Sequence, residues 1–134
     1  MISRRKARET ALKILYNMEM SDGGHEGIME AQLDLLMSGS EEASYAEQLV
    51  KGVESHRRAI DGVIERFSDN WTIDRMPIVD RCILRIAVFE LKHSIGVPYR
   101  VVIDEAVEIA KLYGSEEAPA FVNAVLDRAH KDGN

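Results

Sequence analysis

Apolar residues recur along this chain with the three- and four-residue spacing that is typical of amphipathic helices. The first such stretch predicts a helix from about Ser3, a favourable N-cap, to about Met20, where a Ser-Asp-Gly-Gly segment follows. Its apolar stripe consists of Ala7, Ala11, Ile14, Leu15 and Met18. At about 100° per residue, the opposite side carries Arg5, Glu9, Lys13 and Tyr16. This helix is therefore expected to pack through one face and to present a polar face outward.

The same spacing continues to the end of the chain. A short helix is expected over 27–37, and a longer stretch over about 41–67 skips an apolar turn near His56, which predicts a bend there. Further helices are expected over 78–91, 103–113 and 118–131. Few runs alternate with the two-residue period of a half-buried strand. The pattern predicts an all-α fold of six or seven helices, and the length of 134 residues suits one compact domain, 1–134.

The predicted helix over 78–91 is unusual because apolar residues surround nearly its whole circumference. Its main apolar face consists of Val79, Cys82, Ile83, Ile86 and Ala87. Outside that face lie Leu84, Val88 and Leu91, bordered by Asp80, Arg81 and Arg85. Two explanations fit this pattern. The helix is either central to the fold and packed on all sides, or its second apolar side is covered by a partner protein.

The chain has a formal net charge of −6, which argues against nucleic-acid binding until the distribution of charge is considered. The first 13 residues contain five basic side chains and one acidic side chain, whereas the remaining residues contain 12 basic and 22 acidic ones. The five basic residues are Arg4, Arg5, Lys6, Arg8 and Lys13. An acidic body with one basic end repels phosphate everywhere except at that end.

The cations clustered at 4–8 meet the requirement of phosphate binding for several close positive charges, and arginine adds a planar fork for bidentate contacts. Cations at a helix N-terminus cost roughly 0.3–1 kcal/mol each, which favours a binding role for them. The alternative is a solvated basic terminus in which Arg5–Glu9 and Glu9–Lys13 pairs support the helix. Tyr16, on the same outward side, either stacks on an unpaired base or packs at the edge of the core with its hydroxyl in water.

No pattern in the sequence predicts catalysis or cofactor binding. The four histidines are far apart in the chain and have no neighbour at metal-ligand spacing, and no phosphate-binding glycine loop or nucleophile motif occurs. The single cysteine, Cys82, is expected in the core and suits a reducing compartment. No run approaches the roughly 20 apolar residues of a membrane span, and no secretory signal is found. We therefore expect a cytoplasmic, non-enzymatic protein without a cofactor.

Four segments together resemble the NusB family of bacterial transcription antitermination factors. The first is RRKARE at 4–9, followed by Ala11-Leu12 and Leu15-Tyr16, and the second is WTIDRMPIVDRCILRIA at 71–87. The third is VPY at 97–99 with IDEAVEIAK at 103–111, and the fourth is YGSE at 113–116 with FVNAVLD at 121–127. They occur in the order and at the spacing of the family. Each segment alone is weak evidence, but the set is specific.

The resemblance implies about seven helices in two small bundles. It also implies binding of single-stranded boxA RNA in nascent ribosomal RNA transcripts, jointly with NusE, a protein that also belongs to the small ribosomal subunit. The resulting complex would help RNA polymerase pass termination signals. The positions that match RNA-binding positions of the family are Arg4, Arg5, Lys6, Arg8, Tyr16, Phe121 and Asn123. Lys13 joins them on the charge pattern. The expected NusE contacts are Asp80, which matches an acidic family position, and the neighbouring Leu84 and Val88.

Two departures from the family pattern bear on these expectations. The segment 118–120 is Ala-Pro-Ala where many members have Ser-His followed by Lys or Arg, so an additional basic contact to RNA is missing. Ala124 replaces a glycine. We therefore expect this chain to depend on NusE for tight RNA binding. Two rival functions remain. The first is a protein-assembly domain whose basic segment serves a homodimer or another protein interface. The second is an accessory domain of an RNA methyltransferase, but that function needs a cofactor-binding domain, for which 134 residues leave no space.

Overall fold

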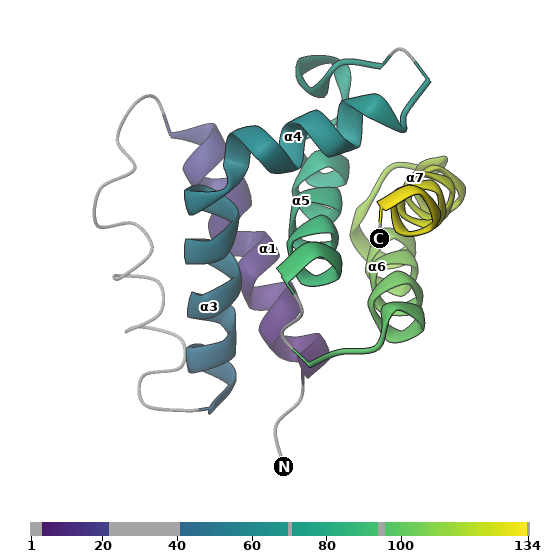
Figure 1. Cartoon of the computed structure of the whole chain (residues 1–134). Coiled ribbons are helices and arrows are strands. Elements are labelled where there is room, and N and C mark those ends of the chain that lie inside the picture. Colours follow the sequence, from purple (N-terminus) through teal and green to yellow (C-terminus); the bar gives the residue numbers. More distant parts are fainter. Residues whose placement is uncertain (1–3, 22–40, 70, 94–95, 134) are drawn as a thin grey trace.

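The structure of the protein, a computed structural model, describes residues 4–21, 41–69, 71–93 and 96–133. These residues form six α-helices and one short 3-10 helix, and they contain no β-strand. The helices are α1 (Arg4–Met20), α3 (Glu41–Ser55), α4 (Arg57–Arg66), α5 (Ile78–His93), α6 (Tyr99–Tyr113) and α7 (Ala118–Gly133), with the 3-10 helix η1 at Ile73–Arg75 (Figure 1). The predicted all-α class is confirmed. The expected N-cap Ser3 and the helix expected over 27–37 lie outside the described residues.

The helix α5 is central and contacts each of the other described α-helices. On one side of it α1 packs against α3, and on the other side α6 packs against α7, while α4 crosses one end (Figure 1). The two groups of helices therefore share α5 between them, which agrees with the two small bundles that the resemblance implied. Because α5 is covered on both sides, it requires apolar residues around most of its circumference.

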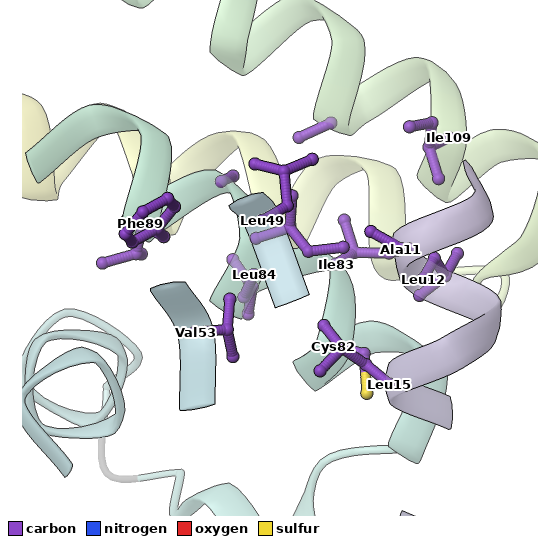
Figure 2. Close-up of a cluster of buried hydrophobic side chains, with 14 of the residues drawn as sticks. Ala11, Leu12, Leu15, Leu49, Val53, Cys82, Ile83, Leu84, Phe89 and Ile109 are labelled. Atoms are coloured by element: carbon purple, nitrogen blue, oxygen red, sulfur yellow. The ribbon is translucent and has the colours of Figure 1, made fainter. Parts of the chain in front are cut away.

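The two apolar residues of α5 that were expected to contact a partner are core residues. Leu84 and Val88 are each 0% exposed. Figure 2 shows Leu84 beside Leu49 and Val53, both on α3. The prediction that Leu84 and Val88 form a partner surface is therefore wrong. Of the two explanations for the all-round apolar pattern of α5, the structure supports a helix that is packed on all sides by its own chain.

The predicted bend near His56 is confirmed, since α3 ends at Ser55 and α4 begins at Arg57. One turn before the bend, α3 passes very close to α5. A Cβ atom placed on Gly52 would lie 2.1 Å from the ring of Phe89, far inside van der Waals contact. Only glycine allows this approach at position 52. The bend and this contact let the two successive helices pack against the same central helix.

Cys82 lies in the core of α5 with no exposed surface, as expected. Burial disfavours the thiolate and raises the pKa of the Cys82 thiol to about 11. We therefore predict that a thiol reagent leaves the folded protein unmodified at neutral pH and labels it rapidly once urea unfolds it, because the thiolate is the reacting species. The rate of labelling is measured with an aromatic disulfide reagent, from the absorbance of the aromatic thiol that the reaction releases. Fast labelling of the folded protein would contradict the prediction.

Candidate nucleic-acid interface

Three of the five basic residues that the charge pattern selected on α1 are exposed and lie outside the bidentate ion pairs that the other two form. These three are Arg4, Lys6 and Lys13. The guanidinium of Arg4 lies 4.7 Å from the centre of the Tyr45 ring, at cation–π distance, so the first turn of α1 rests against α3. Because phosphate contacts require exposed cations, these three residues remain suitable for binding a nucleic-acid backbone.

Arg8 does not belong to this surface. The residue is only 3% exposed, and its Nε and Nη2 atoms each donate a hydrogen bond of 2.8 Å to the Glu90 carboxylate on α5. The Tyr45 hydroxyl donates a further bond of 2.6 Å to the same carboxylate. Burial opposes the charge of Arg8, but the bonds and the charge of Glu90 outweigh it and raise the pKa of Arg8. The prediction that Arg8 contacts RNA is therefore corrected, because Arg8 is a core residue.

Arg5 is exposed but is already paired with a carboxylate. Its Nε and Nη2 atoms donate hydrogen bonds of 2.8 and 2.6 Å to the two carboxylate oxygens of Glu105 on α6. The side chain of Arg5 remains 43% exposed. The Glu105 carboxylate also lies 3.7 Å from Arg8, so it reaches both arginines. Among the predicted RNA contacts, Arg5 therefore offers its Nε–Nη2 edge to a phosphate only if this ion pair opens.

Tyr16 and Lys13 both lie exposed on the outward side of α1, as the helical pattern predicted. A second exposed aromatic residue lies close to the same face. Tyr113, the last residue of α6, makes a side-chain hydrogen bond with Glu9. Partial burial and this acidic neighbour raise the pKa of Tyr113. The sequence placed Tyr113 at the end of a predicted helix and in a family-like segment, but it did not indicate that Tyr113 lies beside α1, because the contact between α1 and the end of α6 is not visible in the chain order.

Phe121 and Asn123, the two α7 residues that match the family signature, differ in exposure. Asn123 is exposed, whereas Phe121 is half-buried, and its ring centre lies 5.8 Å from that of Trp71. Trp71 itself is 49% exposed, which is unusual for so large an apolar side chain. The sequence placed Trp71 in a segment that resembles the NusB family but assigned it no role in binding. The structure adds this aromatic pair to the surface features of α7.

Asp80, the predicted acidic contact for NusE, is buried and fully engaged within the chain. Its carboxylate accepts hydrogen bonds from the backbone N–H and the hydroxyl of Ser115, at 3.0 and 2.7 Å. A Cβ atom on Gly114 would lie 3.0 Å from this carboxylate and 2.7 Å from the Cβ of Ala118. Asp80 therefore connects the start of α5 to the segment that joins α6 and α7. The prediction that Asp80 contacts a partner is corrected on this ground.

A cluster of charged residues at the end of α1 was not predicted. The Glu19 carboxylate accepts hydrogen bonds from Arg57 of α4, at 2.6 Å, and from Arg85 of α5, and Arg81 lies 3.7 Å away. Arg85 also forms a bidentate pair with Asp61. Although burial opposes it, the surrounding arginines lower the pKa of Glu19. This cluster connects α1, α4 and α5. No local sequence signal indicates it, because its members come from distant segments.

Two of the histidines that are far apart in the sequence are neighbours in the fold. The ring centres of His56 and His93 lie 4.1 Å apart, and His93 stacks on Phe89. Among the residues that the structure describes, no group of three or more His, Cys, Asp or Glu side chains could hold a metal ion. Within the same residues, no helix has both the length and the apolar character needed to cross a membrane.

The fold and the surface of α1 define an all-helical protein whose first helix presents exposed cations beside buried and paired ones. The sequence profile of the NusB family matches residues 5–131. The chain is 44% identical over 134 residues to the transcription antitermination protein NusB of Myxococcus xanthus, covering 94% of this chain and 93% of the relative. It is 50% identical over 133 residues to the NusB of Anaeromyxobacter dehalogenans, covering 96% and 91%. The chain belongs to the NusB family.

Solved structures agree with this membership. NusB of T. maritima superposes with a TM-score of 0.87 at 33% identity, covering 98% of this chain and 92% of the other. A chain of a crystal structure of the antitermination factors NusB and NusE in complex with double-stranded RNA superposes with a TM-score of 0.83 at 29% identity, covering 96% of both chains. The family resemblance inferred from the four sequence segments is confirmed.

Proposed function

We propose that this protein is a transcription antitermination factor. It binds boxA-type RNA of nascent ribosomal RNA transcripts together with NusE, and the complex helps RNA polymerase read through terminators. The observation that carries the proposal is the match to NusB proteins along nearly the whole chain, together with the exposed cations on α1. The solved complex of NusB, NusE and RNA supports the choice of partners. The protein acts by binding and not by catalysis, and it works in the cytoplasm, where transcripts are made.

Within this function, Arg4, Lys6 and Lys13 contact phosphates. The exposed Tyr16 and Asn123 and the half-buried Phe121 contact unpaired bases. Stacking of a base on an aromatic side chain contributes on the order of 1–3 kcal/mol. We also infer that 1–134 forms a single domain, since α5 belongs to both groups of helices. NusE docks on a surface other than Leu84 and Val88, because both are enclosed by the chain itself.

The proposal is tested by RNA binding, measured by filter retention with a boxA-like single strand, its duplex form and an unrelated single strand, each with and without NusE. We expect selective binding of the boxA sequence that tightens when NusE is added. Lys13→Glu should weaken binding roughly tenfold and lower the salt slope by ~0.7, because one phosphate contact is lost. The matched control is Lys51→Glu, the same charge change at an exposed position of α3.

Absence of RNA binding in both conditions would contradict the proposed function. Equal effects of Lys13→Glu and Lys51→Glu would contradict the assignment of α1 as the binding face. The rival function, a homodimer or other protein interface, predicts instead that light scattering shows a dimer across a concentration series and that the α1 variant dissociates it.

A further inference from the structure

Arg5 holds a carboxylate in the geometry in which arginine also holds a phosphate. Its Nε and Nη2 atoms face the two oxygens of Glu105, at 2.8 and 2.6 Å, so one edge of the guanidinium is fully occupied. Phosphate and carboxylate both accept this bidentate contact from arginine. An RNA phosphate that approaches this edge of Arg5 therefore meets a position that Glu105 already fills.

The electrostatic surroundings of Arg5 strengthen the pair. The bond and the charge of Glu105 raise the pKa of Arg5, and the charges of Glu108 and Glu9 act in the same direction. The bond from Arg5 likewise lowers the pKa of Glu105. Arg5 is thus surrounded by three acidic residues, which reduces its attraction for a further anion in the free protein.

The Arg5–Glu105 pair can nevertheless open, in contrast to the similar pair in the core. The side chains of Arg5 and Glu105 are 43% and 21% exposed, whereas those of Arg8 and Glu90 are 4% and 1% exposed. Water and salt screen an exposed pair, so separating its members costs little. A buried pair cannot exchange one partner without leaving the other charge desolvated.

We propose that Glu105 is an internal competitor for RNA phosphate at Arg5, released from the guanidinium when RNA binds. The inference deepens the proposed function and rests on it. Glu105 makes a bidentate phosphate contact at the Nε–Nη2 edge of Arg5 a replacement of one anion by another and not a simple gain. Non-specific RNA, which binds through its phosphates alone, gains the least from such an exchange. Glu105 therefore lowers the affinity for every RNA that contacts this edge of Arg5, and only an RNA that also forms base or NusE contacts offsets the loss.

The test is the variant Glu105→Gln, which keeps the side-chain shape and removes the charge. We expect it to bind boxA-like RNA about two- to fivefold more tightly, the range expected for loss of an exposed ion pair. In the wild-type protein, a phosphate bound at Arg5 releases a counterion from the RNA but also frees the Glu105 carboxylate, which takes up a cation. In Glu105→Gln only the release remains, so the salt slope for a single strand should be steeper by ~0.7.

The matched control is Glu108→Gln, which removes the same charge one turn further along α6. Glu108 pairs with Lys111 and not with Arg5. The control variant should tighten binding less than Glu105→Gln does. In a double-mutant cycle, Glu105→Gln in an Arg5→Gln background should tighten binding no more than Glu108→Gln does, because the competing interaction is then absent and only the general loss of negative charge remains. Thermal unfolding of each variant confirms that the proteins compared are folded.

An unchanged or weaker affinity of Glu105→Gln would overturn the inference, and so would equal gains from Glu105→Gln and Glu108→Gln. These outcomes leave the proposed function intact, because the wild-type protein still binds RNA in the same assay. If the wild-type protein binds no RNA with or without NusE, the proposed function fails, and the role of Glu105 fails with it.

Discussion

Arg8→Gln is expected to lower the free energy of unfolding by about 3–5 kcal/mol, the usual effect of removing one partner of a buried ion pair. The reason is the position of Glu90, which is 2% exposed and would lose both bonds from the guanidinium. The Tyr45 hydroxyl would remain as its hydrogen-bond donor, which cannot neutralise the buried charge. Urea denaturation followed by far-UV circular dichroism measures the change.

Arg5→Gln is the matched control for this experiment. It removes the same side chain one turn earlier on α1, from a pair with the same bidentate geometry but with exposed partners. Its expected cost is about 1 kcal/mol or less. Similar losses of stability for the two variants would contradict the assignment of Arg8 to the core. Loss of RNA binding in an Arg8 variant is therefore evidence about folding and not about an RNA contact.

The second large effect is expected for Glu19→Gln. Glu19 accepts hydrogen bonds from Arg57 and Arg85, and its removal leaves Arg57, Arg81 and Arg85 without the anion on which they converge. Hydrogen bonds to charged groups contribute about 1.5–3 kcal/mol each, and partial exposure reduces the total. We expect the free energy of unfolding to fall by about 2–3 kcal/mol at neutral pH.

The dependence of this effect on pH follows from the lowered pKa of Glu19 in the folded protein. A lowered folded pKa gives stability that is present above the unfolded pKa and is lost as the pH falls through the folded value. The difference between wild type and Glu19→Gln should therefore shrink on acidification. The control is Glu54→Gln, whose carboxylate makes a 3.5 Å contact with Arg57 and should cost little. A difference that stays constant from neutral to acidic pH would contradict this account.

The helices were predictable because their apolar periodicity is strong, and the same periodicity placed Lys13 and Tyr16 on the outward side of α1. The prediction for Arg8 was wrong because it rested on the charge of the side chain, although the helical periodicity places Arg8 on the buried side of α1. Arg8, Leu12 and Leu15 follow four- and three-residue spacing, so Arg8 extends the buried stripe of α1. Its partner, Glu90, lies 82 residues away, and a pairing over that distance has no local signal.

The same limit explains the corrected partner surface. Asp80 was expected to contact NusE because it matches an acidic position of the family, and Leu84 and Val88 because they lie outside the main apolar face of their helix. In the fold, α3 covers the apolar side, and Ser115 satisfies the carboxylate. The apolar pattern of α5 indicates that the helix is covered on all sides, but it does not indicate which helices cover it. The Glu19 cluster was unpredictable for the same reason, since α1, α4 and α5 meet only after folding.

Trp71 is the only tryptophan of the chain, and it stands half-exposed against Phe121 at the first turn of α7. The protein therefore carries a natural optical label at one defined point of its surface. Light at wavelengths longer than those that tyrosine absorbs excites only the indole of Trp71. The fluorescence of the protein then reports a single local environment and not an average over several. Events near Phe121 can be followed without attached dyes, and events confined to the start of α1 leave the emission as a reference.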